Sequence, residues 1–216
     1  MIRIHDNIFD KLFLLETSTW LMEDCSYRPN NVANRRSTPF GFEGRHRLMG
    51  CDIYKNYEGI AEKYWEYMHK EHFSWCREGD KPRERFDIFW GMYGSIQTCA
   101  RQKCLLQGID INLQFKGMDG TYHQDGNLNQ TVFIMMFAYH DIEEDMGGEF
   151  FHESTGEKIP FKQGRVIEMT ASDSHRADAF NVYHIPRFSI KFTGLNDEKT
   201  RIYMGDDTVG GKNDDV

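Results

Sequence analysis

Two histidines and one aspartate in this sequence have the residue types and spacing of a metal-ligand set. His123 and Asp125 flank a single residue in the segment Thr121–Asp125, and His175 lies well downstream. Imidazole and carboxylate ligands in this two-to-one ratio suit non-haem Fe(II), and they leave the opposite positions of the metal open for substrate and O₂. Because His-x-Asp alone occurs by chance in many chains, the prediction of an iron site depends on the elements around it.

A cation is predicted close to this ligand set. Alternation along the segment that follows Pro186 places Arg187, Ser189 and Lys191 on one face of a strand, with the opposite face apolar. An arginine inside an apolar barrel is unfavourable unless it meets an anion. The fork of a guanidinium matches a carboxylate, so we expect Arg187 to bind a dicarboxylate cosubstrate. A structural ion pair is the alternative.

Other histidines compete for the role of third ligand. Only two residues separate His184 from Arg187, which is too few for a turn between two strands, so His175 is preferred. His140 and His152 lie beside acidic residues but lack the x-Asp spacing. We interpret both as ordinary polar positions.

The elements that must position these residues begin near residue 109. Ile111, Leu113 and Phe115 alternate with polar residues, as in a half-buried strand, and residues 131–139 are apolar on both faces, as in a central strand. Further short strands are predicted at residues 148–152, 158–161 and 165–169, around His175, and at 187–193. Short strands with frequent turns predict a mainly β fold, namely a double-stranded β-helix of the jelly-roll or cupin-like type. His123 and Asp125, two residues apart on a strand, would point together into it.

Amphipathic patterns precede the strands and predict helices that pack on one outer face of the barrel. They cover residues 6–23, 57–73 and 86–105. Asp6 or Asn7 would supply the N-cap of the first helix. Residues 25–50 read as a loop that holds five arginines. This loop is either a contact surface for an anionic substrate or a solvated segment whose arginines pair with surface carboxylates.

Chain length and pattern predict one domain over residues 1–204. Within it, residues 1–108 form a helical N-terminal part and residues 109–194 form the barrel core. The last segment, 205–216, holds four aspartates and three glycines without an apolar cluster, so we expect a mobile acidic tail.

Composition excludes several classes of partner. A net charge of −8 argues against nucleic acid or an anionic membrane as the main partner. No apolar run approaches the length of a membrane span, and no export signal is visible after Met1. The five cysteines include no C-x-x-C pair, which favours reduced thiols and a cytoplasmic location.

The order of these motifs resembles that of the 2-oxoglutarate- and Fe(II)-dependent dioxygenases, and within them the prolyl-4-hydroxylase-like branch. The resemblance covers roughly residues 109–194. It includes His123-x-Asp125, the segment Gly147–Phe150 (Gly-Gly-Glu-Phe), the distal His175 and the Arg187-x-Ser189 pair.

The resemblance implies a role for each of these residues. His123, Asp125 and His175 would hold Fe(II), and Arg187 would bind the far carboxylate of 2-oxoglutarate with help from Ser189. Tyr139 follows the predicted central strand, where the family often has a tyrosine that assists this contact. His-Asp follows it here, where relatives often have Leu-Asn.

The resemblance also implies the activity. The expected enzyme is a hydroxylase that consumes O₂ and converts 2-oxoglutarate to succinate and CO₂ while it oxidises a C–H bond, with ascorbate as a candidate reductant. The substrate would be a small molecule or a peptide, and the sequence leaves its identity and the oligomeric state open. Two alternatives remain: a cupin-like metal-binding barrel that acts as an isomerase or a cosubstrate-free dioxygenase, which would not need Arg187 and Ser189, and a non-catalytic binding module.

Overall fold

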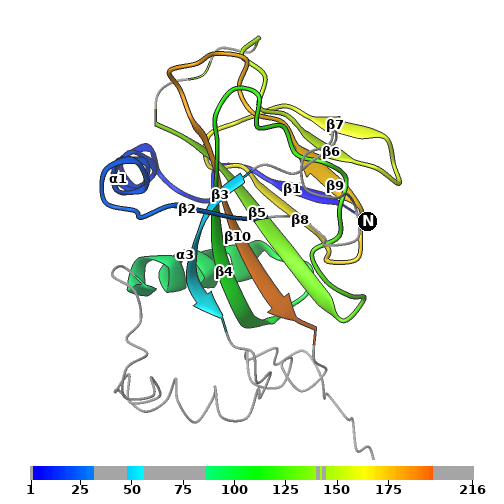
Figure 1. Ribbon diagram of the computed structural model, residues 1–216. Coiled ribbons are helices and arrows are strands. Elements are labelled where there is room, and N and C mark those ends of the chain that lie inside the picture. The colour runs from blue at the N-terminus through cyan, green and yellow to red at the C-terminus, as the bar shows by residue number, and fades with distance from the viewer. Residues whose placement is uncertain (1, 32–47, 56–85, 140–141, 143–144, 197–216) are drawn as a thin grey trace, which may run out of the picture.

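The computed structural model describes residues 2–31, 48–55, 86–139, 142 and 145–196 (Figure 1). Three sequence predictions fall outside these residues: the helix at 57–73, most of the arginine-rich loop, and the acidic tail at 205–216.

A seven-stranded antiparallel sheet forms the larger part of the fold, with the strand order β1-β8-β5-β10-β4-β3-β2. Its strands are β1 (Arg3–His5), β2 (Arg28–Asn31), β3 (Leu48–Lys55), β4 (Leu105–Gln114), β5 (Gln130–Ala138), β8 (Val166–Thr170) and β10 (Arg187–Leu195). Sequence neighbours are often not sheet neighbours: β10, the last strand, lies between β4 and β5.

A three-stranded antiparallel sheet faces the large one. It has the order β7-β6-β9 and consists of β6 (Phe150–His152), β7 (Glu157–Ile159) and β9 (His175–Ala177). One hydrophobic cluster joins the two sheets: it includes Ile134 and Met136 of β5 together with Phe150 of β6 and Ile159 of β7. Two packed antiparallel sheets with this crossing connectivity confirm the predicted double-stranded β-helix.

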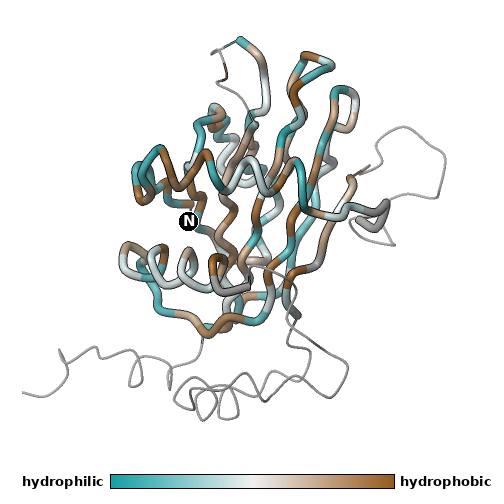
Figure 2. Tube along the Cα trace, turned by 90° about the vertical axis from the view of Figure 1, so that its left-hand side faces the viewer, coloured by the Kyte–Doolittle hydropathy of each residue, from teal (hydrophilic) through white to brown (hydrophobic). Residues whose placement is uncertain are grey.

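Helices cover the outer face of the large sheet. They are α1 (Lys11–Glu23) and α3 (Phe86–Cys99), two of the three that the sequence predicts. Buried side chains of α3 recur at helical spacing, at Phe89, Met92, Tyr93 and Ile96. They belong to one core cluster with the outward-facing residues of β4, β5 and β10. Hydrophobic residues recur along the strands with hydrophilic residues between them (Figure 2), except in β5, which is apolar from Val132 to Ala138.

The first helix begins later than predicted. Its N-cap is Asp10, whose Oδ1 accepts a hydrogen bond from the Phe13 N–H at 2.9 Å, so the prediction of Asp6 or Asn7 as N-cap is wrong. Asn7 has φ 60°, a left-handed conformation that interrupts a right-handed helix. Asp6 instead contacts the Arg165 and Lys162 side chains.

The sheet is also wider than the sequence predicts. The predicted loop at residues 25–50 contains β2 and the beginning of β3, and β4 begins at Leu105, where a helix was expected to end. β3 pairs with β4 from Met49 to Lys55, with a register shift between Asp52 and Tyr54. Backbone pairing with a distant strand fixes these segments, and a local pattern does not report such pairing.

No helix within the described ranges is long and apolar enough to cross a bilayer.

The N-terminus is held to the barrel by an acid-sensitive contact. Asp6 accepts hydrogen bonds from Arg165 Nε at 2.8 Å and Lys162 Nζ at 3.1 Å, and the Arg165 hydrogen bond, more than the Lys162 one, lowers the Asp6 pKa to about 2 against the opposing effect of burial. A lowered folded-state pKa adds stability above the ordinary pKa, and this stability is lost as the pH falls toward 2.

We therefore expect Asp6→Asn to lower the free energy of unfolding by about 1 kcal/mol at pH 7, after allowance for solvent screening. The difference between variant and wild type should shrink steadily from pH 4 to pH 2.5. Urea unfolding across this range measures it, and a difference that does not change with pH would contradict the assignment.

Candidate functional site

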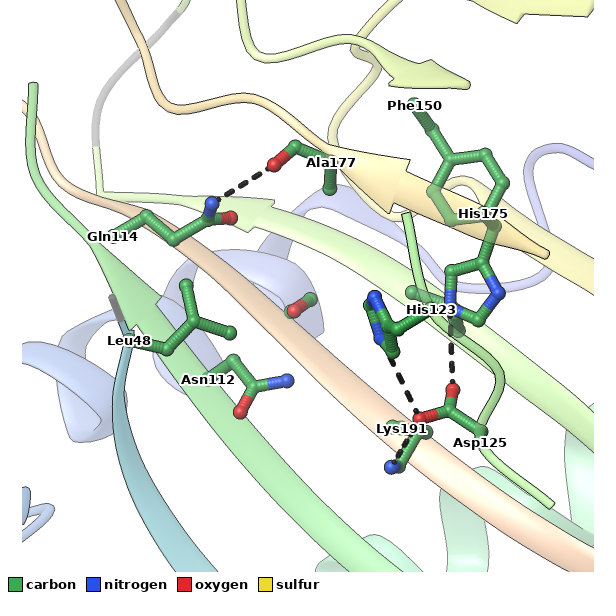
Figure 3. Close-up of a pocket in the computed structure, with 11 residues that line it drawn as sticks. Leu48, Asn112, Gln114, His123, Asp125, Phe150, His175, Ala177 and Lys191 are labelled. Atoms are coloured by element: carbon green, nitrogen blue, oxygen red, sulfur yellow. Dashed lines mark hydrogen bonds and ion pairs between the residues drawn. The ribbon is translucent and has the colours of Figure 1, made fainter. Parts of the chain in front are cut away.

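A cavity opens between the two sheets. Its polar lining includes His123, Asp125, His175, Ser189 and Lys191. Apolar residues complete the wall: Leu48, Ile134, Phe150 and Ala177. Figure 3 shows the two histidines and Asp125 directed toward one another at one end of the cavity.

The three predicted metal ligands come together in this cavity. One ligand atom from each of His123, Asp125 and His175 lies within 4.8 Å of the other two. Asp125 Oδ2 is 3.2 Å from His175 Nε2, and Asp125 Oδ1 is 3.7 Å from His123 Nε2. His123 and Asp125 are two residues apart and His175 lies far downstream, yet the three side chains converge on one point.

Backbone hydrogen bonds bring the two histidine segments together. His123 N donates to the His175 carbonyl and His175 N donates to the His123 carbonyl, both at 3.0 Å. This pair is an isolated bridge, so the His-x-Asp segment is extended without forming the strand that the sequence predicts. Asp125 N donates to the Ala171 carbonyl at 2.9 Å, which fixes the backbone of the third ligand.

Both histidines present the same nitrogen to the cluster. His123 Nδ1 is 2.8 Å from the Thr121 carbonyl oxygen, and His175 Nδ1 is 2.9 Å from the Asp173 carbonyl oxygen. A carbonyl oxygen only accepts, so each Nδ1 carries a proton, and Nε2 is the nitrogen that each ring presents to Asp125 and, when the ring is neutral, can offer to a metal. Burial and the neighbouring His175 lower the pKa of His123, which favours the neutral, metal-binding form.

Asp125 is ionised in this environment. Burial alone would raise its pKa, but Lys191 and His175 outweigh burial and hold the pKa well below its ordinary value. An ionised carboxylate beside two imidazole lone pairs is a donor set for a divalent cation. The residues present therefore fit the metal that the sequence predicts.

Arg187 lies deep in the fold, at the inward position of β10 that precedes Ser189. Its side chain has no exposed surface, its Nε donates to the Gly148 carbonyl at 3.1 Å, and its Nη1 donates to Gln114 Oε1 at 2.9 Å. Its Nη2 is buried and has no hydrogen-bond acceptor among the described residues. Burial lowers the Arg187 pKa to about 10, which leaves the guanidinium charged at neutral pH. A buried, charged donor with an unused N–H edge is suited to an anionic ligand.

Gln114 holds Arg187 in place, and the sequence reading did not single it out. Gln114 is buried on β4 opposite Arg187, and its Nε2 donates to the Met118 and Ala177 carbonyls at 2.8 and 3.0 Å. One side chain therefore connects Arg187 to the strand that carries His175. Figure 3 shows the hydrogen bond from Gln114 to Ala177 of this strand. The signal was present: Gln114 is a polar residue on the face of β4 that alternation turns toward the cavity.

Of the two remaining predicted site residues, Ser189 lines the cavity and Tyr139 is not among its lining residues. Ser189 is buried and lines the cavity between the positions of Arg187 and Lys191. Tyr139 packs instead against the core cluster beneath the helices, and its hydroxyl donates to Glu23 Oε1 at 3.4 Å. Ala138, one residue earlier, is the residue that pairs with Arg187. A shift of one position turns a side chain to the opposite face of a sheet, so Tyr139 lies apart from the other site residues.

Two of the competing histidines, His184 and His152, do not join the cluster. His184 is exposed. His152 is buried on β6, where its Nδ1 is 2.8 Å from Thr155 Oγ1 and its Nε2 is 3.4 Å from Asp173 Oδ2. His140 falls outside the described residues.

Comparison with known proteins places this geometry in a fold family. No protein-family model matches the chain, and no curated protein matches it either. Solved structures do match. A prolyl hydroxylase from Trichoplax adhaerens, solved with a hypoxia inducible factor peptide fragment, has a TM-score of 0.54 and 12% identity, with 94% of this chain and 86% of that chain covered. A Pseudomonas putida prolyl-4-hydroxylase has a TM-score of 0.52 and 9% identity, with 91% and 92% covered.

A 2OG-Fe(II) oxygenase-family oxidoreductase from Burkholderia pseudomallei has a TM-score of 0.50 and 16% identity, with 90% of this chain and 87% of that chain covered. The chain has the fold of the 2-oxoglutarate/Fe(II) oxygenases. At these identities the likeness concerns the fold, and the His-Asp-His cluster within it fits the metal site of such an oxygenase. The resemblance inferred from the sequence motifs is thereby confirmed at the level of architecture.

Proposed function

We propose that this protein is a 2-oxoglutarate- and Fe(II)-dependent oxygenase that hydroxylates a C–H bond. The observation that carries the proposal is the pairing of a convergent His-Asp-His cluster with a buried guanidinium, Arg187, whose Nη2 lacks an acceptor among the described residues. The two features lie on the walls of one barrel. The metal-only alternatives do not account for the arginine.

Fe(II), 2-oxoglutarate and O₂ would supply the oxidising chemistry, with succinate and CO₂ as coproducts and ascorbate as a candidate reductant. His123, Asp125 and His175 would hold the metal through Nε2, carboxylate and Nε2 atoms. Arg187 would bind the far carboxylate of 2-oxoglutarate with its free N–H edge, and Ser189 lies at the next inward position of β10 to donate a further hydrogen bond.

The surrounding residues would hold Arg187 in one orientation and limit the access of water to the reacting atoms. Gln114 accepts one hydrogen bond from the guanidinium and donates to two backbone carbonyls, which would hold the Arg187 side chain in one orientation. Phe150 stacks on the His175 ring, with centroids 5.2 Å apart and planes at 18°, and Ile134 lines the same cavity. These apolar groups limit water around the reacting atoms, which strengthens the electrostatic contacts there.

We propose a small molecule or a peptide as the substrate. The Trichoplax adhaerens neighbour was solved with a peptide fragment, which supports a peptide as one option. The cavity is partly open and carries Asn112 and Lys191 on its polar wall, so groups of the substrate would meet hydrogen-bonding partners near the metal.

The proposed function predicts a spectroscopic signal. Anaerobic addition of Fe(II) and 2-oxoglutarate to the purified protein should produce a weak visible charge-transfer band, because the keto acid would chelate iron held by the protein. The band should be absent when succinate replaces 2-oxoglutarate. Protein that binds Fe(II) but develops no band on addition of 2-oxoglutarate would contradict the proposal.

A further inference from the structure

A lysine occupies the cavity beside the proposed metal ligands. Lys191 Nζ lies 2.9 Å from Asp125 Oδ1 and 3.6 Å from Asp110 Oδ2 (Figure 3). The Lys191 side chain is 18% exposed and the Asp125 side chain 9% exposed. The ammonium therefore contacts, inside the barrel, one of the three groups that would bind the metal.

The fold fixes this contact from two sides. β10 places Lys191 opposite Asp110 of β4 and Ile134 of β5, so its stem is confined between neighbouring strands. The backbone of Asp125 is held by a hydrogen bond to Ala171, and its carboxylate lies beside the Nε2 atoms of both histidines.

The charges around this point explain why a cation is present. Lys191 contacts two carboxylates, those of Asp110 and Asp125, and both imidazoles lie beside Asp125 in a mostly buried space. Without a cation, the carboxylates would repel each other in an environment of low dielectric constant. Lys191 supplies one positive charge to this group in the absence of any metal.

We propose that Lys191 is a resident cation that stabilises the metal-free site and reduces its affinity for a divalent metal. The proposal rests on the proposed function only in treating Asp125 as a metal ligand. A metal bound to Asp125 stands a few ångström from the ammonium, and both are positive. At an effective dielectric constant of about 20, such repulsion corresponds to at least roughly tenfold in a dissociation constant.

A purely structural ion pair predicts the opposite result. If Lys191 served only to hold Asp125 in position, its removal would weaken metal binding and protein stability together. If Lys191 is a resident cation, its removal should tighten metal binding but make the metal-free protein less stable.

The experiment uses Co(II) alone, without 2-oxoglutarate, and follows metal binding by visible absorption. Lys191→Met removes the charge and retains much of the volume, and we expect the Kd for Co(II) to fall at least about tenfold. Lys191→Arg keeps the charge and should stay within about threefold of wild type. Lys116→Met removes the same charge from an exposed position and is the matched control, with an unchanged Kd expected.

Thermal unfolding of the metal-free proteins provides the second readout. Lys191→Met should have a lower Tm than wild type without metal, and the difference should narrow or reverse with Co(II). If Lys191→Met does not fold, Lys191→Gln takes its place with the same expectation. Unchanged or weaker Co(II) binding in a folded charge-removing variant overturns the proposal for Lys191. Failure of the wild type to bind Co(II) would instead refute the metal site and the proposed function.

Discussion

Replacement of Arg187 by methionine is expected to raise the Kd for 2-oxoglutarate by about 10²- to 10⁴-fold. Methionine fills much of the same space but removes the charge and the buried N–H donors. Hydrogen bonds to a charged group contribute about 1.5–3 kcal/mol each, and a bidentate contact provides two of them. The loss should appear in calorimetric titration of 2-oxoglutarate into protein loaded with Mn(II).

Two further variants make this result specific to the Arg187 guanidinium. Arg187→Lys keeps the charge but loses the planar fork, so its affinity should lie between those of wild type and Arg187→Met. Arg101→Met removes an exposed arginine and should bind 2-oxoglutarate as wild type does. Mn(II) affinity should stay within a few-fold of wild type in all three variants. Full 2-oxoglutarate affinity in a folded Arg187→Met protein would mean that Arg187 serves the barrel and not the cosubstrate.

Replacement of His175 by alanine is expected to weaken Co(II) or Fe(II) binding at least about 100-fold. His175 supplies one of three convergent ligand atoms, and loss even of a group that only orients a ligand typically reduces metal affinity 10- to 100-fold. Equilibrium titration of the metal-free protein measures the change. The metal-free variant should retain a cooperative unfolding transition, which shows that the barrel is intact.

His184→Ala is the matched control for this measurement. His184 was the rival third ligand in the sequence, and the structure leaves it exposed and outside the cluster. Its replacement should change the Kd for metal less than about twofold. Loss of metal in His184→Ala together with retention in His175→Ala would overturn the ligand assignment.

Together these titrations separate two parts of the site. Arg187 variants test the cosubstrate end and His175 variants test the metal end. The Arg187 variants should leave metal affinity largely unchanged, because Arg187 is not one of the proposed metal ligands. Loss of metal in His175→Ala should also weaken 2-oxoglutarate binding, because the keto acid would chelate the metal.

Strand patterns could be predicted well because the direction of a side chain in a strand is a local property. Alternation along β10 was sufficient to assign Arg187, Ser189 and Lys191 to the interior, and their burial and cavity contacts agree. The same rule made the continuous apolar run of β5 a central strand, which it is. Motif order then indicated the oxygenase fold.

Prediction failed where an element depends on a distant partner. β2 and the first three residues of β3 lie in the predicted loop, and they are strands because they extend the edge of the sheet beyond β4. A local pattern also does not give the register of β5 against β10, which places Ala138 opposite Arg187. A contact of Tyr139 with the cosubstrate stays a prediction. A shift of one residue is nearly invisible in sequence and reverses the face of a side chain.

The sequence by itself determined which residues could bind a metal and an anion, and on which face of a strand each would lie. Only the tertiary structure decided which of them meet. Lys191 and Asp125 are far apart in the chain, as are Arg187 and Gln114, and their contacts depend on the registers of β10 and β4 and on the single bridge between His123 and His175. The strength of charge interactions depends on distance and burial, which no local pattern records.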